Sequence, residues 1–369
     1  MEYIVSARKY RPATFESVVG QKNITSTLKN AISNNKIAHA YLFCGPRGVG
    51  KTTCARIFAK TINCANLENG TLNTCNECVS CISFNENRSF NIHELDAASN
   101  NSVDDIRMLI EKVRIPPQEG KYSVYIIDEV HMLSTQAFNA LLKTLEEPPA
   151  YAIFILATTE KHKIIPTIIS RCQVFDFSRI TVNDVVEHLK YVADSEGITA
   201  DIDGLAVIAQ KADGAMRDAL SIFDQIVAFS GKNITYQSVV ENLNVLDYDI
   251  FFDIVNSISQ HDYLSAMLTL DSKVIAKGFD MLNFLSGLSH HLRNVLVAKH
   301  PQSVSLLDVS EKTAERYISQ AQSLDNYYTI KLIEIIASYE LNYKQARDKR
   351  QHVEFALLKA CMEGDEKKK

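Results

Sequence analysis

The stretch Tyr41–Ala55, "YLFCGPRGVGKTTCA", sets the fold class of this chain. A short apolar run ends at Gly45, and a loop with two further glycines leads into Lys51 and Thr52. This matches the pattern G-x-x-x-x-G-K-[ST], in which glycines let backbone N–H groups surround phosphate, the lysine adds a cation and the hydroxyl serves magnesium. We therefore expect a strand, a phosphate-binding loop and a helix over Lys51–Asn63 whose positive end faces the anion.

Apolar runs alternate with helical patterns from residue 40 to residue 178, which is typical of a parallel sheet covered by helices. The expected strands are "AYLFCG", "NIHELDA", "SVYIIDE", "YAIFILATT" and "QVFDF". After Phe177 the strand patterns cease, and Thr181 with Asp184 resembles a capping box that opens a run of short helices. Longer amphipathic helices follow from about residue 247.

These patterns predict an α/β fold class with helical domains appended. A P-loop domain with a parallel sheet is expected over residues 1–178, a small helical lid domain over 179–243 and an all-α domain over 244–362. Residues 363–369, "EGDEKKK", are expected to form a disordered end.

Composition is that of a globular protein of two or three domains, with 369 residues, 46% apolar and 22% charged. No apolar run approaches the roughly 20 residues that span a bilayer, and the amino terminus lacks a signal-peptide core. These features predict a cytoplasmic location without a membrane partner. The net charge of −5 argues against a generally basic nucleic-acid binder, so any DNA contact must be local or shared among subunits.

An acidic pair follows a second apolar strand, in "VYIIDEVH". Asp128 ends the strand and is suited to hold magnesium through water, and Glu129 can polarise an attacking water. A solvent-exposed acid pair is the plainer alternative, but the phosphate-binding loop upstream makes it less probable. The pair favours hydrolysis over binding alone.

Other polar residues occupy positions where a terminal phosphate could be sensed. Thr158 and Thr159 end the strand "IFILATT", at the sheet edge where α/β sites lie. Arg171 follows a short helix and Arg217 begins a later one, and an arginine stabilises charge during phosphoryl transfer. Taken singly, either arginine is more often a surface or salt-bridge residue, so these residues alone leave the two roles open.

Four of the eight cysteines cluster in the spacing C-x10-C-x2-C-x2-C, within residues 64–81: Cys64, Cys75, Cys78 and Cys81. Four soft ligands with two tight spacings suit tetrahedral, structural Zn²⁺, because no open position remains for water. A redox role is the alternative, and His93 is a weak substitute ligand. Cys44, Cys54, Cys172 and Cys361 are most simply buried small apolar residues.

The motifs together resemble the AAA+ ATPases, and more closely the gamma/tau family of clamp-loader subunits of bacterial DNA polymerase III. The resemblance rests on "ARKYRPATFESVVGQ", the cysteine insertion after the P-loop helix, "LDAASN", "IIDEVHMLSTQAFNALLKTLEEPP", "ILATTE", "ISRCQ" and "GAMRDALS". It covers about residues 3–230; the rest matches that family's collar domain only in length and helicity.

The resemblance implies a role for each motif residue. ATP and Mg²⁺ would be held by the loop residues Gly45, Pro46, Arg47, Gly48, Val49, Gly50, Lys51, Thr52 and Thr53, with Arg11, Pro12, Val18 and Val19 near the adenine and ribose. Asp128 and Glu129 would serve the metal and the water, and Thr159 (or Thr158) would be the first sensor. Arg171 would be an arginine finger acting on a neighbour's ATP, and Arg217 a second sensor in its own subunit.

The resemblance also implies partners. A five-subunit ring with delta, delta-prime and further gamma/tau copies would open the sliding clamp and load it on primer–template DNA, within the DNA-directed DNA polymerase III holoenzyme. The tau form carries a long tail for polymerase and helicase, which this sequence does not contain. Two alternatives remain: another AAA+ machine for branch migration or helicase loading, and a non-hydrolysing ring scaffold.

Overall fold

The structure is a computed structural model that describes residues 4–67, 72–243, 246–307, 309 and 311–363. The predicted disordered end lies outside the described residues except for Glu363, as do part of the predicted boundary at 243/244 and residues 68–71 of the cysteine segment. The chain separates into two compact units, Met1–Val192 with Lys211–Gln225 and Ala193–Gln210 with Ile226–Lys369. The three-domain division stays a prediction.

The first unit is built on a five-stranded parallel sheet in the order β2-β3-β4-β1-β5. The expected strands all form: β1 (Ala40–Cys44), β2 (Ile92–Asp96), β3 (Ser123–Asp128), β4 (Ala152–Thr158) and β5 (Gln173–Asp176). Cys44 pairs with Thr158 and Asp96 with Asp128, so the strands end at one edge of the sheet. The α/β expectation is confirmed, and this edge is where ligands of parallel sheets bind.

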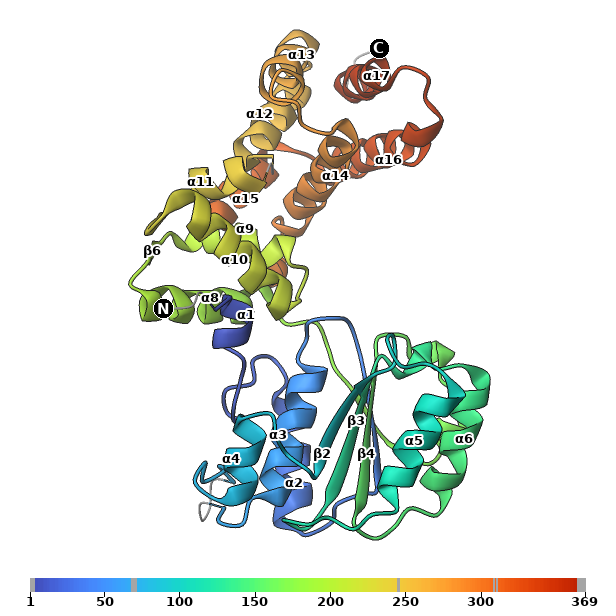
Figure 1. Cartoon of the computed structure of the whole chain (residues 1–369). Helices are drawn as coiled ribbons and strands as arrows, with labels where there is room; N and C mark the ends of the chain where they lie inside the picture. Colours follow the sequence, from blue (N-terminus) through green and yellow to red (C-terminus); the bar gives the residue numbers. More distant parts are fainter. Residues whose placement is uncertain (1–3, 68–71, 244–245, 308, 310, 364–369) are drawn as a thin grey trace. The chain divides into compact units, whose positions relative to one another are not determined.

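Helices cover both faces of the sheet (Figure 1). α2 (Lys22–Ser33) and α3 (Lys51–Asn63) pack on one face, and α5 (Val103–Val113) and α6 (Thr135–Glu146) on the other. The side chains of β1 alternate, so that Phe43 packs toward α3 while Leu42 packs toward the opposite face, and both are fully buried. This two-sided burial explains why the strand sequences are continuously apolar.

Local signals fix several helix boundaries. Ser102 and Asp105 form a capping box that starts α5, and the Ser134 hydroxyl accepts the Ala137 N–H at the start of α6. The Thr181 hydroxyl accepts the Asp184 N–H where α8 (Val182–Glu196) begins, as expected. The shorter helices of this unit are α1 (Ser6–Lys9), α4 (Val79–Asn85), η1 (Val130–Met132), η2 (Lys161–Lys163) and α7 (Pro166–Ile169).

After Phe177, the elements of the described residues are helices apart from two short strands that the sequence did not predict. β6 (Thr199–Ala200) and β7 (Asn233–Ile234) pair in parallel. Each has two residues, which is too short to produce an alternating apolar pattern. The nearby helices are α9 (Ile202–Lys211), α10 (Met216–Ser230) and α11 (Tyr236–Leu243).

The core of the second unit is formed by the helices that follow α11. It comprises α12 (Tyr248–Ser259), α13 (Tyr263–Thr269), the π-helix η3 (Leu270–Ile275), α14 (Met281–Val297), η4 (Pro301–Leu306), α15 (Glu311–Ser323), α16 (Asn326–Asn342), η5 (Tyr343–Gln345) and α17 (Lys349–Met362). Phe284 of α14, Leu332 of α16 and Leu357 of α17 are fully buried in one apolar cluster. Among the described residues, no helix is long and apolar enough to cross a membrane.

Candidate nucleotide-binding site and metal centre

The loop between β1 and α3 has a backbone that requires glycine. Gly45 has φ +145°, and a Cβ there would lie 2.4 Å from the carbonyl oxygen of Phe177. Gly50 is the residue before α3 and has φ +102°, in the left-handed region. Side chains at these positions would displace the backbone from the path it follows around the start of α3.

Lys51 is almost completely buried at the start of α3, with 6% of its surface exposed. Its Nζ donates to the carbonyl oxygens of Gly45 and Pro46, each at 2.8 Å. Burial lowers the pKa of Lys51, while the carboxylates of Glu129 and Asp128 oppose that shift. The loop therefore holds this cation through its own carbonyl groups.

Thr52 and Asp128 meet where α3 begins and β3 ends. The Thr52 hydroxyl donates to Asp128 Oδ2 at 2.7 Å. A hydroxyl and a carboxylate are the hard oxygen donors that Mg²⁺ prefers. The two residues therefore fit a shared magnesium ion.

Glu129 has an unusual backbone conformation for a non-glycine residue, with φ +47°. Its Oε2 accepts hydrogen bonds from the Thr159 N–H at 3.3 Å and the Thr159 hydroxyl at 3.0 Å. Such backbone outliers cost free energy and cluster at functional sites. The conformation directs the Glu129 carboxylate to Thr159.

Thr158 has a different environment from Thr159. It is fully buried, and its hydroxyl lies 3.0 Å from Nδ1 of His131 and accepts the Glu160 N–H at 3.0 Å. His131 also lies 3.4 Å from Glu129 Oε2 and 3.1 Å from Glu160 Oε2. Sequence reasoning assigned no role to His131, although it lies two positions after Glu129 in "DEVH".

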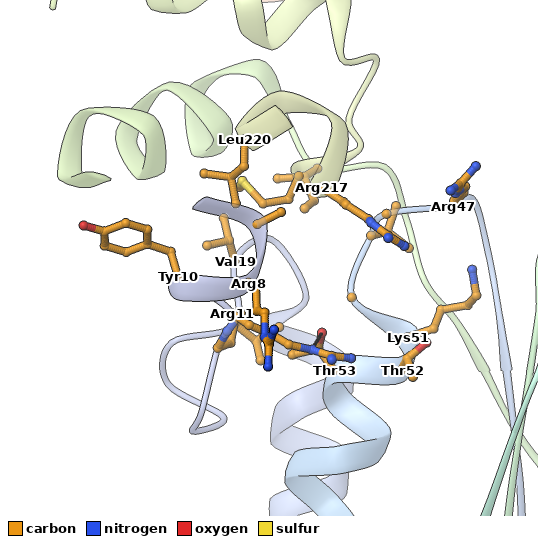
Figure 2. Close-up of a pocket in the computed structure, with 18 of the residues that line it drawn as sticks. Arg8, Tyr10, Arg11, Val19, Arg47, Lys51, Thr52, Thr53, Arg217 and Leu220 are labelled. Carbon is orange, nitrogen blue, oxygen red and sulfur yellow. Dashed lines mark hydrogen bonds between the residues drawn. The ribbon is translucent and has the colours of Figure 1, made fainter. Parts of the chain in front are cut away.

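A cavity of about 530 Å³ lies between the start of α3 and the start of α10 and is lined in part by the loop (Figure 2). Of the predicted site residues it is lined by Arg11, Pro12, Val18, Val19, Arg47, Gly48, Val49, Gly50, Lys51, Thr52, Thr53, Asp128, Glu129 and Arg217. Arg217 and Leu220 come from α10, on the opposite side of the cavity from Thr52 and Thr53 of α3. Gly45, Pro46, Thr158, Thr159 and Arg171 are not among the lining residues.

Sequence reasoning assigned no role to the further lining residues Val5, Ala7, Arg8, Tyr10, Ile180, His188, Met216 and Leu220, although five of them lie within the motifs "ARKYRPATFESVVGQ" and "GAMRDALS". The Ser6 N–H donates to Asp224 Oδ2 at 2.7 Å and thereby joins α1 to α10. Arg11 is anchored to α3, because its Nε donates to the Thr53 hydroxyl at 3.3 Å, and burial lowers its pKa. These long-range contacts leave no local sequence pattern.

Arg171 lies in a separate surface groove, lined by Ala38, His39, Ala40, Leu145, Glu146, Glu147, Pro148, Ser170, Arg171 and Gln173. Its guanidinium donates to the Thr167 carbonyl oxygen at 2.8 Å and forms an ion pair with Glu146 at 2.6 Å. The structure therefore brings Arg217, but not Arg171, to the cavity.

The four clustered cysteines come together as predicted, with their Sγ atoms within 4.8 Å of one another. The Sγ atoms of Cys64 and Cys75 are 3.5 Å apart, and tetrahedral Zn²⁺ with Zn–S of about 2.3 Å requires a spacing of about 3.8 Å. Backbone N–H groups of Glu77 and Cys78 lower the pKa of Cys75 to about 6, whereas burial raises the pKa of Cys64 and of Cys81, so metal binding would have to release protons from those two thiols. The donor set fits zinc.

The other predicted cysteine and histidine positions are apart from this cluster. His93 stacks on Tyr125 with ring centroids 4.9 Å apart. Cys44, Cys54 and Cys361 are buried as expected, whereas Cys172 is only partly buried. Burial raises the pKa of Cys54 and of Cys172 to about 12, so both are neutral thiols at physiological pH.

Two known protein families match parts of this chain. The family described as "DNA polymerase III, delta subunit" matches residues 20–181, and "DNA polymerase III clamp loader subunit, ATPase lid domain" matches residues 184–232. The chain is 40% identical over 361 residues to DNA polymerase III subunit tau of Bacillus subtilis, covering 98% of this chain and 64% of that protein. It is 37% identical to the Escherichia coli tau subunit, of which it covers 55%.

A shorter relative matches along nearly its whole length. DNA polymerase III subunit gamma of Buchnera aphidicola is 35% identical over 363 residues, which are 97% of this chain and 97% of that protein. The chain thus spans little more than half to about two thirds of its tau relatives and almost all of a gamma relative. It belongs to the gamma/tau family of DNA polymerase III subunits.

Proposed function

We propose that this chain is an ATP-hydrolysing subunit of the DNA polymerase III clamp loader, which opens a sliding clamp and loads it on primer–template DNA. The observation that carries the proposal is the assembly of Lys51, Thr52, Asp128 and Glu129 around one cavity, with Arg217 on its far side. Membership in the gamma/tau family of DNA polymerase III subunits supports a role in DNA replication.

The residues of α3 and β3 that line the cavity, with Glu129, would each have a separate role in ATP hydrolysis. Lys51 would place its positive charge against the outer phosphates, and Thr52 with Asp128 would hold Mg²⁺, which would offset phosphate charge when bound. Glu129 accepts a proton from the attacking water and orients it. Thr159 fixes the Glu129 carboxylate through two hydrogen bonds, so we assign the first-sensor role to Thr159 in preference to Thr158.

The two arginines act on different nucleotides. Arg217 lines the cavity of its own chain and can contact the phosphates there as the second sensor. Arg171 lies outside this cavity, which is consistent with a finger that reaches a neighbouring subunit's ATP. Its ion pair with Glu146 is partly exposed, so exchanging Glu146 for phosphate costs little.

The part of the cavity near Val18 and Val19 is suited to the nucleoside. Val18 and Val19 provide apolar surface, and Arg11 and Pro12 lie beside them, as the resemblance implied for adenine and ribose. Tyr10 and Leu220 also line this part of the cavity.

The four cysteines would hold structural zinc. The partners in the ring would be delta, delta-prime and further gamma/tau copies.

The test is ATP turnover by the assembled loader with and without clamp and primed DNA. We expect the two together to stimulate hydrolysis. Turnover that ignores clamp and DNA but responds to branched DNA would support a branch-migration ATPase instead. An assembled ring in which this chain binds ATP but never hydrolyses it would support the scaffold alternative.

A further inference from the structure

The helix that follows the phosphate-binding loop also carries the first cysteine ligand. α3 begins at Lys51 and ends at Asn63, and Cys64 comes directly after it. Lys51 and Lys60 are separated by nine positions, or about 14 Å along a helix axis. Most of α3 is buried between its ends, which makes it a rigid connection between the two sites.

Lys60, in the last turn of α3, is a buried cation. Only 6% of its surface is exposed, and no ion pair among the described residues includes it. Its Nζ donates to Asn76 Oδ1 at 2.5 Å and to Asn85 Oδ1 at 2.8 Å. Amide oxygens and the negative end of the helix stabilise an ammonium group, but none of them carries a full opposing charge.

Both amide acceptors belong to the cysteine segment. Asn76 directly follows Cys75, and Asn85 lies four positions after Cys81 on α4, which places both on one side of that helix. Arg56, one turn before Lys60, extends the contact, with its guanidinium 4.8 Å from the centre of the Phe84 ring. In Figure 1, α4 lies beside α3.

The zinc-loaded centre would supply the negative charge that Lys60 lacks among its hydrogen-bond partners. Four thiolates and one Zn²⁺ carry a formal charge of −2, whereas four thiols carry none. A buried cation that is held by Asn76, the residue after Cys75, favours the zinc-loaded state, and the zinc-loaded state favours the buried cation. The hydrogen bond from Lys60 to Asn85 also holds the carboxy-terminal half of α3 against α4.

We propose that zinc binding at the four cysteines and nucleotide binding at the loop are coupled through α3, and that Lys60 is the positioning residue that couples them. Zinc fixes the end of α3, and the fixed helix presents Lys51 and Thr52 in their phosphate-binding geometry at lower entropic cost. This rests on the proposed nucleotide site. Coupling between sites is reciprocal, so each ligand must change the affinity of the other by one common factor.

The experiment measures both halves of that cycle on the full chain. A fluorescent ADP is titrated into zinc-loaded and zinc-depleted protein, and zinc affinity is measured by chelator competition with and without ADP. We expect one zinc per chain and a common factor of about five- to tenfold. A factor of one with normal ADP binding would overturn the coupling and leave the proposed function standing, whereas no ADP binding in either form would overturn the proposed function.

Variants then test Lys60 itself. Lys60→Met removes the charge and keeps the length, and we expect it to retain one zinc while the common factor falls toward one. The matched control is Lys112→Met, at an exposed lysine of α5, which should keep the full factor. If Lys60→Met does not fold, Asn85→Ala removes one acceptor and should lower the factor part of the way. A full factor in a folded Lys60→Met protein, or in Asn85→Ala, would overturn the assignment.

Discussion

Two regions of the first unit present an arginine in opposite ways. In the cavity, Arg217 shares one enclosed space with Lys51 and Asp128. In the surface groove, Arg171 forms an ion pair with Glu146, and none of the described residues that line this groove belongs to the loop between β1 and α3. The chain therefore gathers the groups of the proposed nucleotide site in one cavity and displays Arg171 on its exterior, where the proposed role is to act on the ATP of another subunit.

The largest effect should come from removing the cation of the cavity. Lys51→Ala leaves the phosphates without the buried ammonium that the loop carbonyls hold, so we expect nucleotide binding to be lost in the isolated chain. Equilibrium titration with a fluorescent ATP analogue measures this. Lys36→Ala, at an exposed lysine, is the control and should bind normally. Normal affinity in Lys51→Ala would refute the cavity as the phosphate site.

The next largest effect belongs to the groove and appears only after assembly. Arg171→Ala should keep the ATP affinity of the isolated chain, because Arg171 does not line the cavity. In the assembled ring we expect turnover to fall by about 10³-fold, the lower end of the range for arginine fingers. Steady-state turnover before and after assembly separates the two readouts. Weakened binding in the isolated chain would place Arg171 in its own subunit's site instead.

A smaller effect should distinguish the neighbouring threonines. Thr159→Val removes one hydrogen bond to the Glu129 carboxylate, and bonds to charged groups contribute about 1.5–3 kcal/mol, so turnover should fall by at least about tenfold. Thr158→Val instead leaves buried partners around His131 unsatisfied, and should lower the free energy of unfolding. Turnover of assembled protein and denaturant unfolding measure the pair. The reverse pattern would exchange their roles.

The smallest effect concerns the ion pair of the groove. Glu146→Gln releases Arg171, and partly exposed pairs contribute about 0.2–1 kcal/mol. We therefore expect turnover of the assembled ring to rise by less than about fivefold, with no change in the isolated chain. A loss of turnover would show that Glu146 positions Arg171 for catalysis instead of restraining it.

The sequence predicted most of what depends on local pattern. The five strands, the helix Lys51–Asn63 and the cysteine cluster are found where spacing and apolar runs placed them. The strand order and the packing of α1 against α10 were not predictable, since a contact such as that of Ser6 with Asp224 joins distant segments. Thr158 and Thr159 could not be separated either, because the sequence does not show that β4 ends at Thr158 or in which direction each of the two side chains points.

One measurement tests the cavity and the groove together. ATP turnover is compared for rings assembled from Lys51→Ala chains, from Arg171→Ala chains and from a mixture of the two. Each variant alone should turn over ATP poorly, one because it cannot bind the nucleotide and the other because no finger reaches it. In the mixture, Arg171 of a Lys51→Ala chain can act on ATP held by an Arg171→Ala chain, so we predict that turnover recovers in part. Full turnover by assembled Arg171→Ala alone, or no recovery in mixed rings of verified composition, would contradict a site completed by a second subunit.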